Sequence, residues 1–175
     1  MRNLKKITWE QYNHHVIDLA SQLKDVKLDL IVGVARGGLA PATQLSHLLG
    51  CRNFGIYAAQ KTVSDEVLVF DQKTEVRVTG SIFPNIKPKT ILVVEDVMGY
   101  GDIFSLLDAS LKEFYGEEVT IIYSTLYVDL DMLKNSPNAR FAKDIKFVVN
   151  YKKSEDWIVF PWEKDPTEDK ENADG

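Results

Sequence analysis

Apolar runs and amphipathic stretches alternate along most of the chain, and this alternation predicts an α/β fold. The apolar runs are short, rich in β-branched residues and nearly free of charge, which is typical of strands buried on both faces of a parallel sheet. These strands are expected at residues 28–34, 91–94, 119–127 and 145–150, with a shorter one at 54–58. Outside these runs, in stretches before and between the strands, apolar residues recur every three or four positions. That period predicts helices at residues 9–24, 39–49 and 103–116, which would flank a mostly parallel central sheet.

A different pattern, in which apolar and polar residues alternate, occupies residues 60–82. Valines stand in alternation at positions 67, 69, 76 and 78. Such alternation predicts an antiparallel hairpin with one face in water, which we interpret as a flap over a neighbouring site. Residues 130–142 show neither period and are expected to be irregular.

The composition narrows the class of protein. With 175 residues, of which 45% are hydrophobic, the chain can form one domain, which we expect to span residues 1–163. A net charge of −5 argues against nucleic acid or an anionic membrane surface as the partner. The single cysteine excludes a disulfide framework, and no apolar run approaches the ~20 residues that span a bilayer. We therefore expect a cytoplasmic protein with a disordered acidic tail at residues 164–175.

The strongest candidate for a site begins where the apolar run 91–94 ends. Two carboxylates, Glu95 and Asp96, follow directly, and a loop with two glycines then leads into a helix. Carboxylates bind sugar hydroxyls or a metal, and the amides of a glycine loop and a helix start bind phosphate. The alternative is an ordinary strand-to-helix turn, in which Asp102 is the N-cap of a helix beginning at residue 103. In that role the Asp102 carboxylate would accept a hydrogen bond from the amide near Ser105.

A second turn of this kind follows the apolar run 28–34. Its sequence is Ala35-Arg36-Gly37-Gly38, and a helical pattern begins immediately after it. Glycines let backbone N–H groups approach an anion, and arginine adds a bidentate donor, so the turn is a candidate anion clamp. The alternative is an exposed arginine in an ordinary turn.

An aromatic segment, DWIVFPWE at residues 156–163, stands near the end of the chain. It holds two tryptophans and a phenylalanine, which can form either a plug on the edge of the core or a stacking wall for a planar ring. The segment alone leaves both interpretations open.

Three stretches taken together resemble type I phosphoribosyltransferases, most closely the xanthine–guanine and hypoxanthine–guanine branch. They are VGVARGGLAP at 32–41, ILVVEDVMGYGD at 91–102 and DWIVFPWE at 156–163. The resemblance implies a mostly parallel sheet with a small hood or flap hairpin at about 60–82 and a base-site segment at 150–163. It also implies a Mg²⁺-dependent enzyme of purine salvage that joins a nucleobase to 5-phosphoribosyl diphosphate and releases diphosphate. Members commonly form dimers or tetramers, so a homo-oligomer is expected.

Carried over by position, the resemblance assigns roles to the two turns. Arg36, Gly37 and Gly38 match the diphosphate loop, and the Ala35–Arg36 peptide is a candidate for the non-proline cis bond common there. Glu95 and Asp96 match the acidic pair that holds the ribose hydroxyls, with Asp96 expected at the metal. Arg36, Glu95 and Asp96 are therefore the expected catalytic residues.

The resemblance also assigns a ribose and phosphate loop and a base site. The loop residues are Glu95, Asp96, Gly99, Tyr100, Gly101, Asp102 and Ser105. Trp157 matches the residue that stacks on the purine, and Ile158 matches the residue whose backbone reads the edge of the base.

The loop also departs from the family pattern. The loop aspartate, often assigned as a base near the purine, is Gly99, and the two threonines are Tyr100 and Ile103. Asp102 places a negative charge where a 5′-phosphate is expected, and a like-charge contact at ~4 Å costs roughly 4 kcal/mol at an effective dielectric near 20. The lysine that this branch uses to meet the purine 6-oxo group is replaced by Ser124 or Asp129, depending on the alignment.

These features support alternative functions. The first is a divergent purine-type phosphoribosyltransferase, which we favour on the weight of the resemblance. The second is a catalytically impaired nucleotide-binding or regulatory module on the same fold. The third is a transferase with a non-standard donor, because Asp102 can accept a hydroxyl in place of a phosphate.

Overall fold

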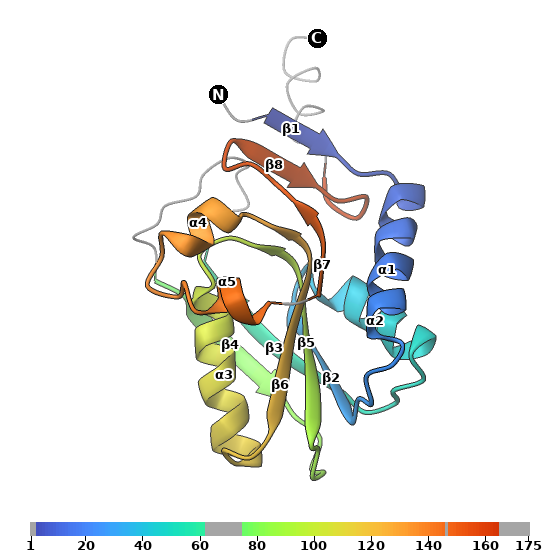
Figure 1. Ribbon diagram of the computed structural model, residues 1–175, viewed down its shortest axis with the longest axis vertical. Coiled ribbons are helices and arrows are strands. Elements are labelled where there is room, and N and C mark those ends of the chain that lie inside the picture. Colours follow the sequence, from blue (N-terminus) through green and yellow to red (C-terminus); the bar gives the residue numbers. More distant parts are fainter. Residues whose placement is uncertain (1–2, 62–74, 146, 165–175) are drawn as a thin grey trace.

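The central sheet has six strands in the order β4-β3-β2-β5-β6-β7 (Figure 1). The structure is a computed structural model that describes residues 3–61, 75–145 and 147–164. The strands are β2 (Leu30–Ala35), β3 (Phe54–Gln60), β4 (Arg77–Ile82), β5 (Thr90–Met98), β6 (Thr120–Val128) and β7 (Phe147–Tyr151). All neighbouring pairs are parallel except β3 and β4. The expected α/β class with a mostly parallel sheet is confirmed.

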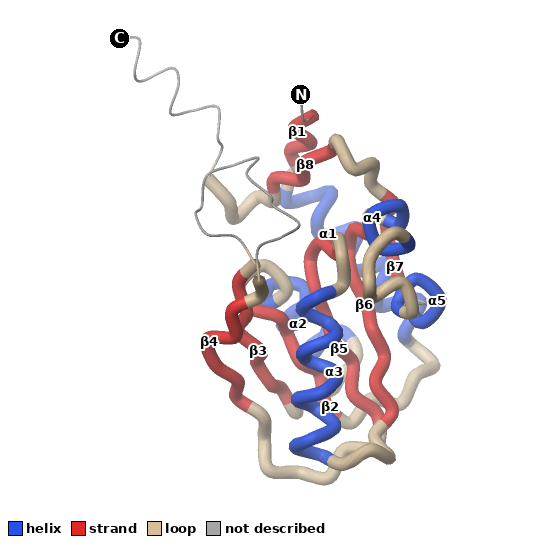
Figure 2. Tube along the Cα trace, turned by 90° about the vertical axis from the view of Figure 1, so that its left-hand side faces the viewer, coloured by secondary structure: helices blue, strands red, loops and turns tan. Residues whose placement is uncertain are grey.

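Helices cover both faces of this sheet, and each face buries its own core. On one side lie α1 (Trp9–Leu23) and α2 (Leu39–Leu48), which pack with Ile31, Leu92 and Val94. On the other side lies α3 (Asp102–Tyr115), which runs along the strands in Figure 2 and packs with Val32, Ile91 and Val93. Because successive side chains of a strand point to opposite faces, a continuous apolar run such as that in β5 supplies both cores.

The order in which strands are added to the sheet reverses between the parallel neighbours β2 and β5. From β2 the chain crosses through α2 to β3 on one side, and from β5 it crosses through α3 to β6 on the other. In the parallel register Gly33 lies beside Val94, so the carboxyl ends of both strands meet at one edge. In open α/β sheets this is the crevice in which ligands bind.

Several elements differ from the sequence-based expectations. Strand β5 runs on to Met98, beyond the predicted end at residue 94, because its last residues pair with Tyr127 and Val128 of β6. Residues 130–142 are not all irregular. They contain α4 (Leu130–Lys134), whose N-cap is Asp129, and the start of α5 (Phe141–Asp144).

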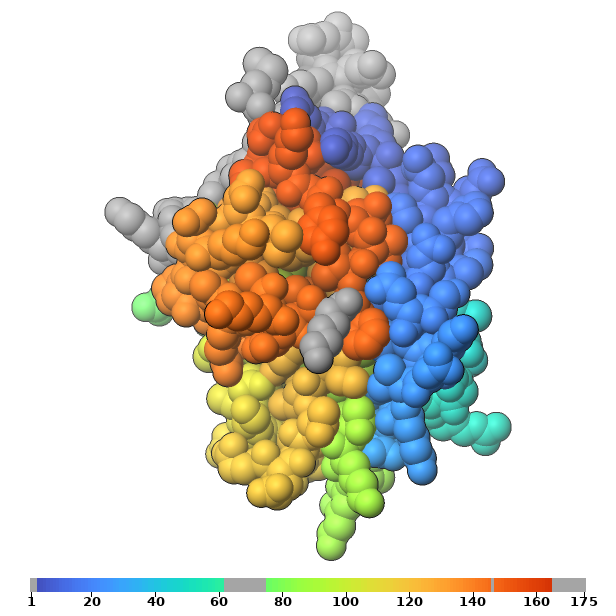
Figure 3. Space-filling model, in the orientation of Figure 1, coloured from blue at the N-terminus to red at the C-terminus, as the bar shows by residue number. Residues whose placement is uncertain are grey.

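A second, two-stranded sheet was not predicted. Strand β1 (Asn3–Lys6) pairs in parallel with β8 (Asp156–Val159), which joins the two ends of the described chain at the top of Figure 1. The space-filling view shows the C-terminal segments, in orange and red, meeting α1, in blue, across the upper part of the molecule (Figure 3).

The flap is described only in part. Strand β4 pairs antiparallel with β3, and all of its residues are exposed, so the expectation of one buried face is not met there. The valines at 67 and 69 and the tail at 165–175 lie outside the described residues. Among the described helices, none combines the length and the apolar character that crossing a bilayer requires.

Candidate functional site

The turn after β2 holds the residues expected to bind diphosphate. The peptide bond between Ala35 and Arg36 is cis, as expected. Gly37 follows, and Gly38 is the N-cap residue of α2, which carries no side-chain cap. The turn therefore presents backbone groups and one guanidinium at the carboxyl edge of the sheet.

The two glycines of this turn lie directly against the end of β5. A Cβ atom added at Gly37 would stand 1.8 Å from Oδ2 of Asp96. One added at Gly38 would stand 2.5 Å from the carbonyl oxygen of Val94. At Gly38 a side chain would clash with fixed backbone atoms, so the contact with β5 requires glycine there, whereas at Gly37 a side chain would have to displace the Asp96 carboxylate. The structure thus brings the expected diphosphate loop and the expected acidic pair together.

Glu95 and Asp96 form a carboxyl pair with a low tendency to ionise. Glu95 is only 8% exposed, and burial, with the charge of Asp96 beside it, raises its pKa well above the ordinary value. Burial also raises the pKa of Asp96, although its Oδ1 accepts a hydrogen bond of 2.7 Å from the Val97 amide. Such a pair gains charge when a cation or the hydroxyl groups of a ligand stabilise the ionised form.

The chemistry of this donor set fits Mg²⁺. No group of three or more His, Cys, Asp or Glu side chains in the described residues is arranged to hold a metal ion. Mg²⁺, however, is commonly held by one or two carboxylates together with substrate phosphates. Asp96 and Glu95 provide such a partial set.

The loop between β5 and α3 corrects one expectation. The N-cap of α3 is Gly101, with φ +75°, and Asp102 is the first residue of the helix. Within the part of the chain that the structure describes, no side chain caps α3 at this end, and the Ser105 amide donates to the carbonyl oxygen of Gly101 at 3.1 Å. The prediction that Asp102 caps the helix is therefore wrong. Gly99 lies in open space, because a Cβ there would meet only the sulfur of Met132, at 3.9 Å.

The carboxylate of Asp102 has partners that the sequence did not indicate. Lys61, at the end of β3, donates to Oδ2 in an ion pair. Asn138, between α4 and α5, donates from Nδ2 to Oδ1 at 2.6 Å. No local motif marks Lys61 or Asn138, because both reach the loop only through the folding of distant segments.

The aromatic segment divides into two parts. Phe160 and Trp162 stack with ring centroids 4.7 Å apart, and Trp162 meets Tyr12 of α1 edge-on at 5.0 Å. These rings form a plug on the core. Trp157 is half-buried in β8 beside Leu4, and Ile158 is only 6% exposed. That Trp157 forms a stacking wall for a planar ring stays a prediction.

Glu163, which follows Trp162, interacts electrostatically with Asp96 of the acidic pair. Its Oε2 accepts a hydrogen bond of 2.9 Å from the Phe160 amide. Burial and the charge of Asp96 raise the pKa of Glu163, while Arg36 acts to lower it. The C-terminal segment, expected to supply the base site, thus approaches both turns, and Glu163 is a residue of this region to which the sequence assigned no role.

The two candidates for the purine-reading position are both engaged inside the fold. Ser124 and Asp129 are fully buried. Ser124 donates to the carbonyl oxygen of Val93 at 2.9 Å, and Asp129 accepts from Lys152 at 3.3 Å. Lys152, in the loop directly after β7, also donates to the carbonyl oxygen of Asp156 at 3.1 Å, which links this loop to the start of β8.

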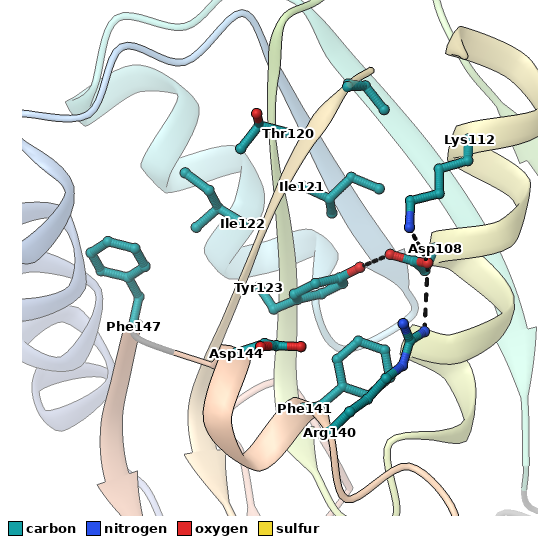
Figure 4. Close-up of a pocket in the computed structure, with 11 residues that line it drawn as sticks. Asp108, Lys112, Thr120, Ile121, Ile122, Tyr123, Arg140, Phe141, Asp144 and Phe147 are labelled. Atoms are coloured by element: carbon teal, nitrogen blue, oxygen red, sulfur yellow. Dashed lines mark hydrogen bonds and ion pairs between the residues drawn. The ribbon is translucent and has the colours of Figure 1, made fainter. Parts of the chain in front are cut away.

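A cavity of about 520 Å³ lies elsewhere, between α3, the first half of β6 and α5 (Figure 4). Its polar groups meet one another: Asp108 accepts from Tyr123 and from Lys112, the latter at 2.9 Å, and Arg140 approaches it at 3.5 Å. Although burial opposes it, these hydrogen bonds hold the pKa of Asp108 below its ordinary value. We interpret this network as a structural link between α3 and β6, because none of the expected site residues lines the cavity.

Comparison with known proteins gives a consistent set of relatives. Residues 8–168 match the family described as phosphoribosyl transferase domain. The transcriptional regulator GfcR of Methanococcus maripaludis strain C5 is 29% identical over 151 residues, covering 74% of this chain and 64% of the regulator. The chain thus spans less than two thirds of the length of the curated relatives it matches.

Solved structures resemble the fold over nearly the whole chain. A purine phosphoribosyltransferase from Pyrococcus horikoshii is 27% identical with a TM-score of 0.71, covering 93% of this chain and 95% of that one. A xanthine-guanine-hypoxanthine phosphoribosyltransferase from Helicobacter pylori, 16% identical, has a TM-score of 0.72 and covers 97% and 99%. A hypothetical protein from Neisseria gonorrhoeae with bound ppGpp, 18% identical, has a TM-score of 0.70 and covers 99% and 97%.

Proposed function

The chain belongs to the phosphoribosyltransferase domain family, and on that premise we propose that it transfers a phosphoribosyl group from 5-phosphoribosyl diphosphate to a purine-type base. The observation that carries the proposal is the contact between Gly37 and Asp96. It supports the proposal because the amides of the turn after β2 and the carboxyls at the end of β5 lie in one crevice, where a single ligand with a diphosphate on a ribose could contact both.

Different residues of the crevice bind different parts of the donor, 5-phosphoribosyl diphosphate. Arg36 and the backbone of Gly37 and Gly38 bind the diphosphate, and Glu95 and Asp96 hold the ribose hydroxyls. Asp96, with the help of Glu95, would hold Mg²⁺, which would supply positive charge that stabilises the leaving diphosphate. When a bound donor and cation stabilise the ionised form of the pair, its negative charge would stabilise the ribose carbon that becomes electron-poor as the bond to diphosphate breaks.

The reaction is a simple displacement at the ribose. A ring nitrogen of the base forms a bond to the anomeric carbon, and the bond from that carbon to diphosphate breaks with its electron pair. The proton on the ring nitrogen leaves to solvent. Trp157 stacks on the base, and the backbone at Ile158 reads its edge.

A regulatory nucleotide-binding module is the second candidate. Gly99 removes a carboxyl side chain from the loop, and the curated relatives that match are named transcriptional regulators. A module of this kind binds donor or nucleotide in the same crevice without turnover. Nucleotides such as ppGpp, which a structural neighbour binds, belong among the ligands to test.

Product analysis separates the two candidates. The protein is mixed with Mg²⁺, 5-phosphoribosyl diphosphate and a panel of purine and pyrimidine bases, and diphosphate and new nucleotide are measured. A transferase releases diphosphate only with its base. Binding of the donor by calorimetry with no turnover on any base would favour the module, and the absence of both binding and turnover would reject both candidates.

The variant Asp96→Asn tests the assigned metal residue. We expect it to abolish Mg²⁺-dependent donor binding, because an amide is a weaker ligand for a hard cation. Glu118→Gln removes an acid from an exposed turn and serves as the control. Unchanged binding by Asp96→Asn would remove the acidic pair from the mechanism.

A further inference from the structure

The ion pair between Lys61 and Asp102 stands at the start of α3, inside the loop expected to bind a 5′-phosphate. Lys61 is well shielded, with its side chain 9% exposed, while that of Asp102 is 30% exposed. The Lys61 ammonium also lies 4.6 Å from the centre of the Tyr100 ring. A shielded cation therefore sits within the loop, and its charge is balanced by Asp102.

Asp102 does not depend on Lys61 alone. Asn138 donates to its other carboxylate oxygen, Oδ1, at 2.6 Å. The same amide group donates to the carbonyl oxygen of Tyr100 at 3.1 Å, and Ser136 donates to that oxygen at 2.9 Å. These bonds anchor the loop from the α4–α5 connection. Asp102 therefore keeps a strong neutral donor, and the loop keeps its shape, when Lys61 moves away.

Among the described residues no side chain caps the start of α3, and Asp102 turns its carboxylate to Lys61 and Asn138 instead. An anion at a helix start is stabilised by the amides of the first turn and by any nearby cation. A phosphate there and the Asp102 carboxylate would compete for the ammonium of Lys61.

We propose that Lys61 is an exchangeable cation, which neutralises Asp102 in the ligand-free protein and passes to the phosphate of a bound nucleotide or phosphoribosyl donor. Asp102 thereby weakens the binding of phosphorylated ligands, because its carboxylate competes with the phosphate for the Lys61 ammonium. This inference rests on the proposed function, because it places the phosphate at the start of α3. It makes Lys61 a residue that binds phosphate and Asp102 a residue that sets its affinity.

The two halves of the ion pair are expected to act in opposite directions. Asp102→Asn keeps the bond with Asn138 and releases Lys61, so it should tighten binding of guanosine 5′-monophosphate about tenfold. Lys61→Gln removes the cation and leaves Asp102 ionised near the phosphate, so it should weaken that binding at least tenfold. Lys61→Arg retains a cation and should restore most of the affinity. A pair with only a structural role would weaken binding when either half is removed.

Titration calorimetry with guanosine 5′-monophosphate and with guanosine provides the readout. The changes in affinity should appear with the nucleotide and be absent with the nucleoside, which lacks the phosphate. Glu118→Gln and Lys143→Gln change the same net charges on exposed positions and should leave both affinities unaltered.

The outcomes separate this inference from the proposed function. If the unmodified protein binds neither 5-phosphoribosyl diphosphate nor the nucleotide, the proposed function fails. If it binds them but Asp102→Asn weakens binding as Lys61→Gln does, the exchange of partners is wrong while the proposed function stands. Should Lys61→Gln fail to fold, the tightening expected of Asp102→Asn and the behaviour of Lys61→Arg still decide the matter.

Discussion

The α-carbon of Gly37 lies so close to the carboxylate of Asp96 that a single methyl group cannot be inserted between them. The position of an added Cβ, 1.8 Å from Oδ2, is far inside van der Waals contact. This contact joins the turn after β2 to the end of β5. It explains in steric terms why the two turns form one crevice.

Gly37→Ala should therefore damage the crevice. The methyl group must displace Asp96 or the turn, and we expect the affinity for 5-phosphoribosyl diphosphate with Mg²⁺ to fall at least tenfold, or ~1.4 kcal/mol. Calorimetric titration measures this loss. Gly80→Ala is the matched control, because no atom lies within 4 Å of a Cβ added there. Equal affinities in the two variants would contradict the crevice.

The raised pKa of Glu95 leads to a prediction about stability and pH. A carboxyl group whose pKa is higher in the folded state than in the unfolded state favours folding less as the pH rises. This loss begins above its unfolded pKa of about 4.3 and continues until the folded pKa is passed. Glu95→Gln should therefore stabilise the ligand-free protein at pH 8.

Thermal unfolding at several pH values checks this expectation. Each 1 kcal/mol gained corresponds to about 2–4 °C in Tm for a domain of this size. The difference between Glu95→Gln and the unmodified protein should shrink towards pH 4. If Glu95→Gln were less stable than the unmodified protein at both pH 8 and pH 4, the Glu95 carboxylate would not be destabilising the folded state.

Substitutions at Gly99 test whether the reaction is limited by the lack of the aspartate that the family pattern has at this position. A side chain fits at this position, because a Cβ would meet only the Met132 sulfur at 3.9 Å. If transfer of the base proton limits the reaction, Gly99→Asp should raise kcat, within the roughly 10²–10⁴-fold range of general acid–base catalysis. Gly99→Asn has nearly the same size without the charge and should not. Identical rates in all three proteins would mean that no base is needed at this position.

Trp157 is expected to be the stacking residue of the base site. Stacking of a base on an aromatic side chain contributes about 1–3 kcal/mol, so Trp157→Ala should weaken nucleotide binding by roughly five- to 150-fold. Trp157→Phe should recover much of this loss. Binding of ribose 5-phosphate, which has no base, should not change in either variant, and a parallel loss there would point to general damage of β8.

The network around Asp108 predicts an effect on stability far from the crevice. The pKa of Asp108 is lower in the folded protein, so its contribution is fully present above the unfolded pKa and is lost as the pH falls through the lower folded value. Asp108→Asn should cost about 1–3 kcal/mol at pH 7, and this cost should diminish below about pH 4.

Chemical denaturation at pH 7 and pH 3.5 measures this cost. Tyr123→Phe removes a single hydroxyl donor and should cost less, about 0.5–1.5 kcal/mol. Donor binding should be the same in both variants. A change in donor affinity without a change in stability would assign the network to the site.

The regular elements follow from local patterns. The apolar runs of β2, β5 and β6 and the helical periods of α1 and α3 appear in the sequence because the burial of each element depends on its own side chains. Only their ends shifted: β5 continued to Met98 because pairing with β6 holds its acidic residues in the ladder. The roles proposed for Arg36, Glu95, Asp96 and Trp157 rest on their positions within motifs.

The sequence by itself determined the α/β class, the two glycine turns and the carboxyl pair, because these are local patterns of polarity and backbone freedom. Tertiary structure alone decided what the loop contacts. Lys61 and Asp102 are 41 residues apart, and Asn138 lies 36 residues beyond Asp102, so no pattern links them. The pairing of β1 with β8 is of the same kind. Electrostatic and hydrogen-bond partners depend on distance in space, and only the folded chain sets that distance.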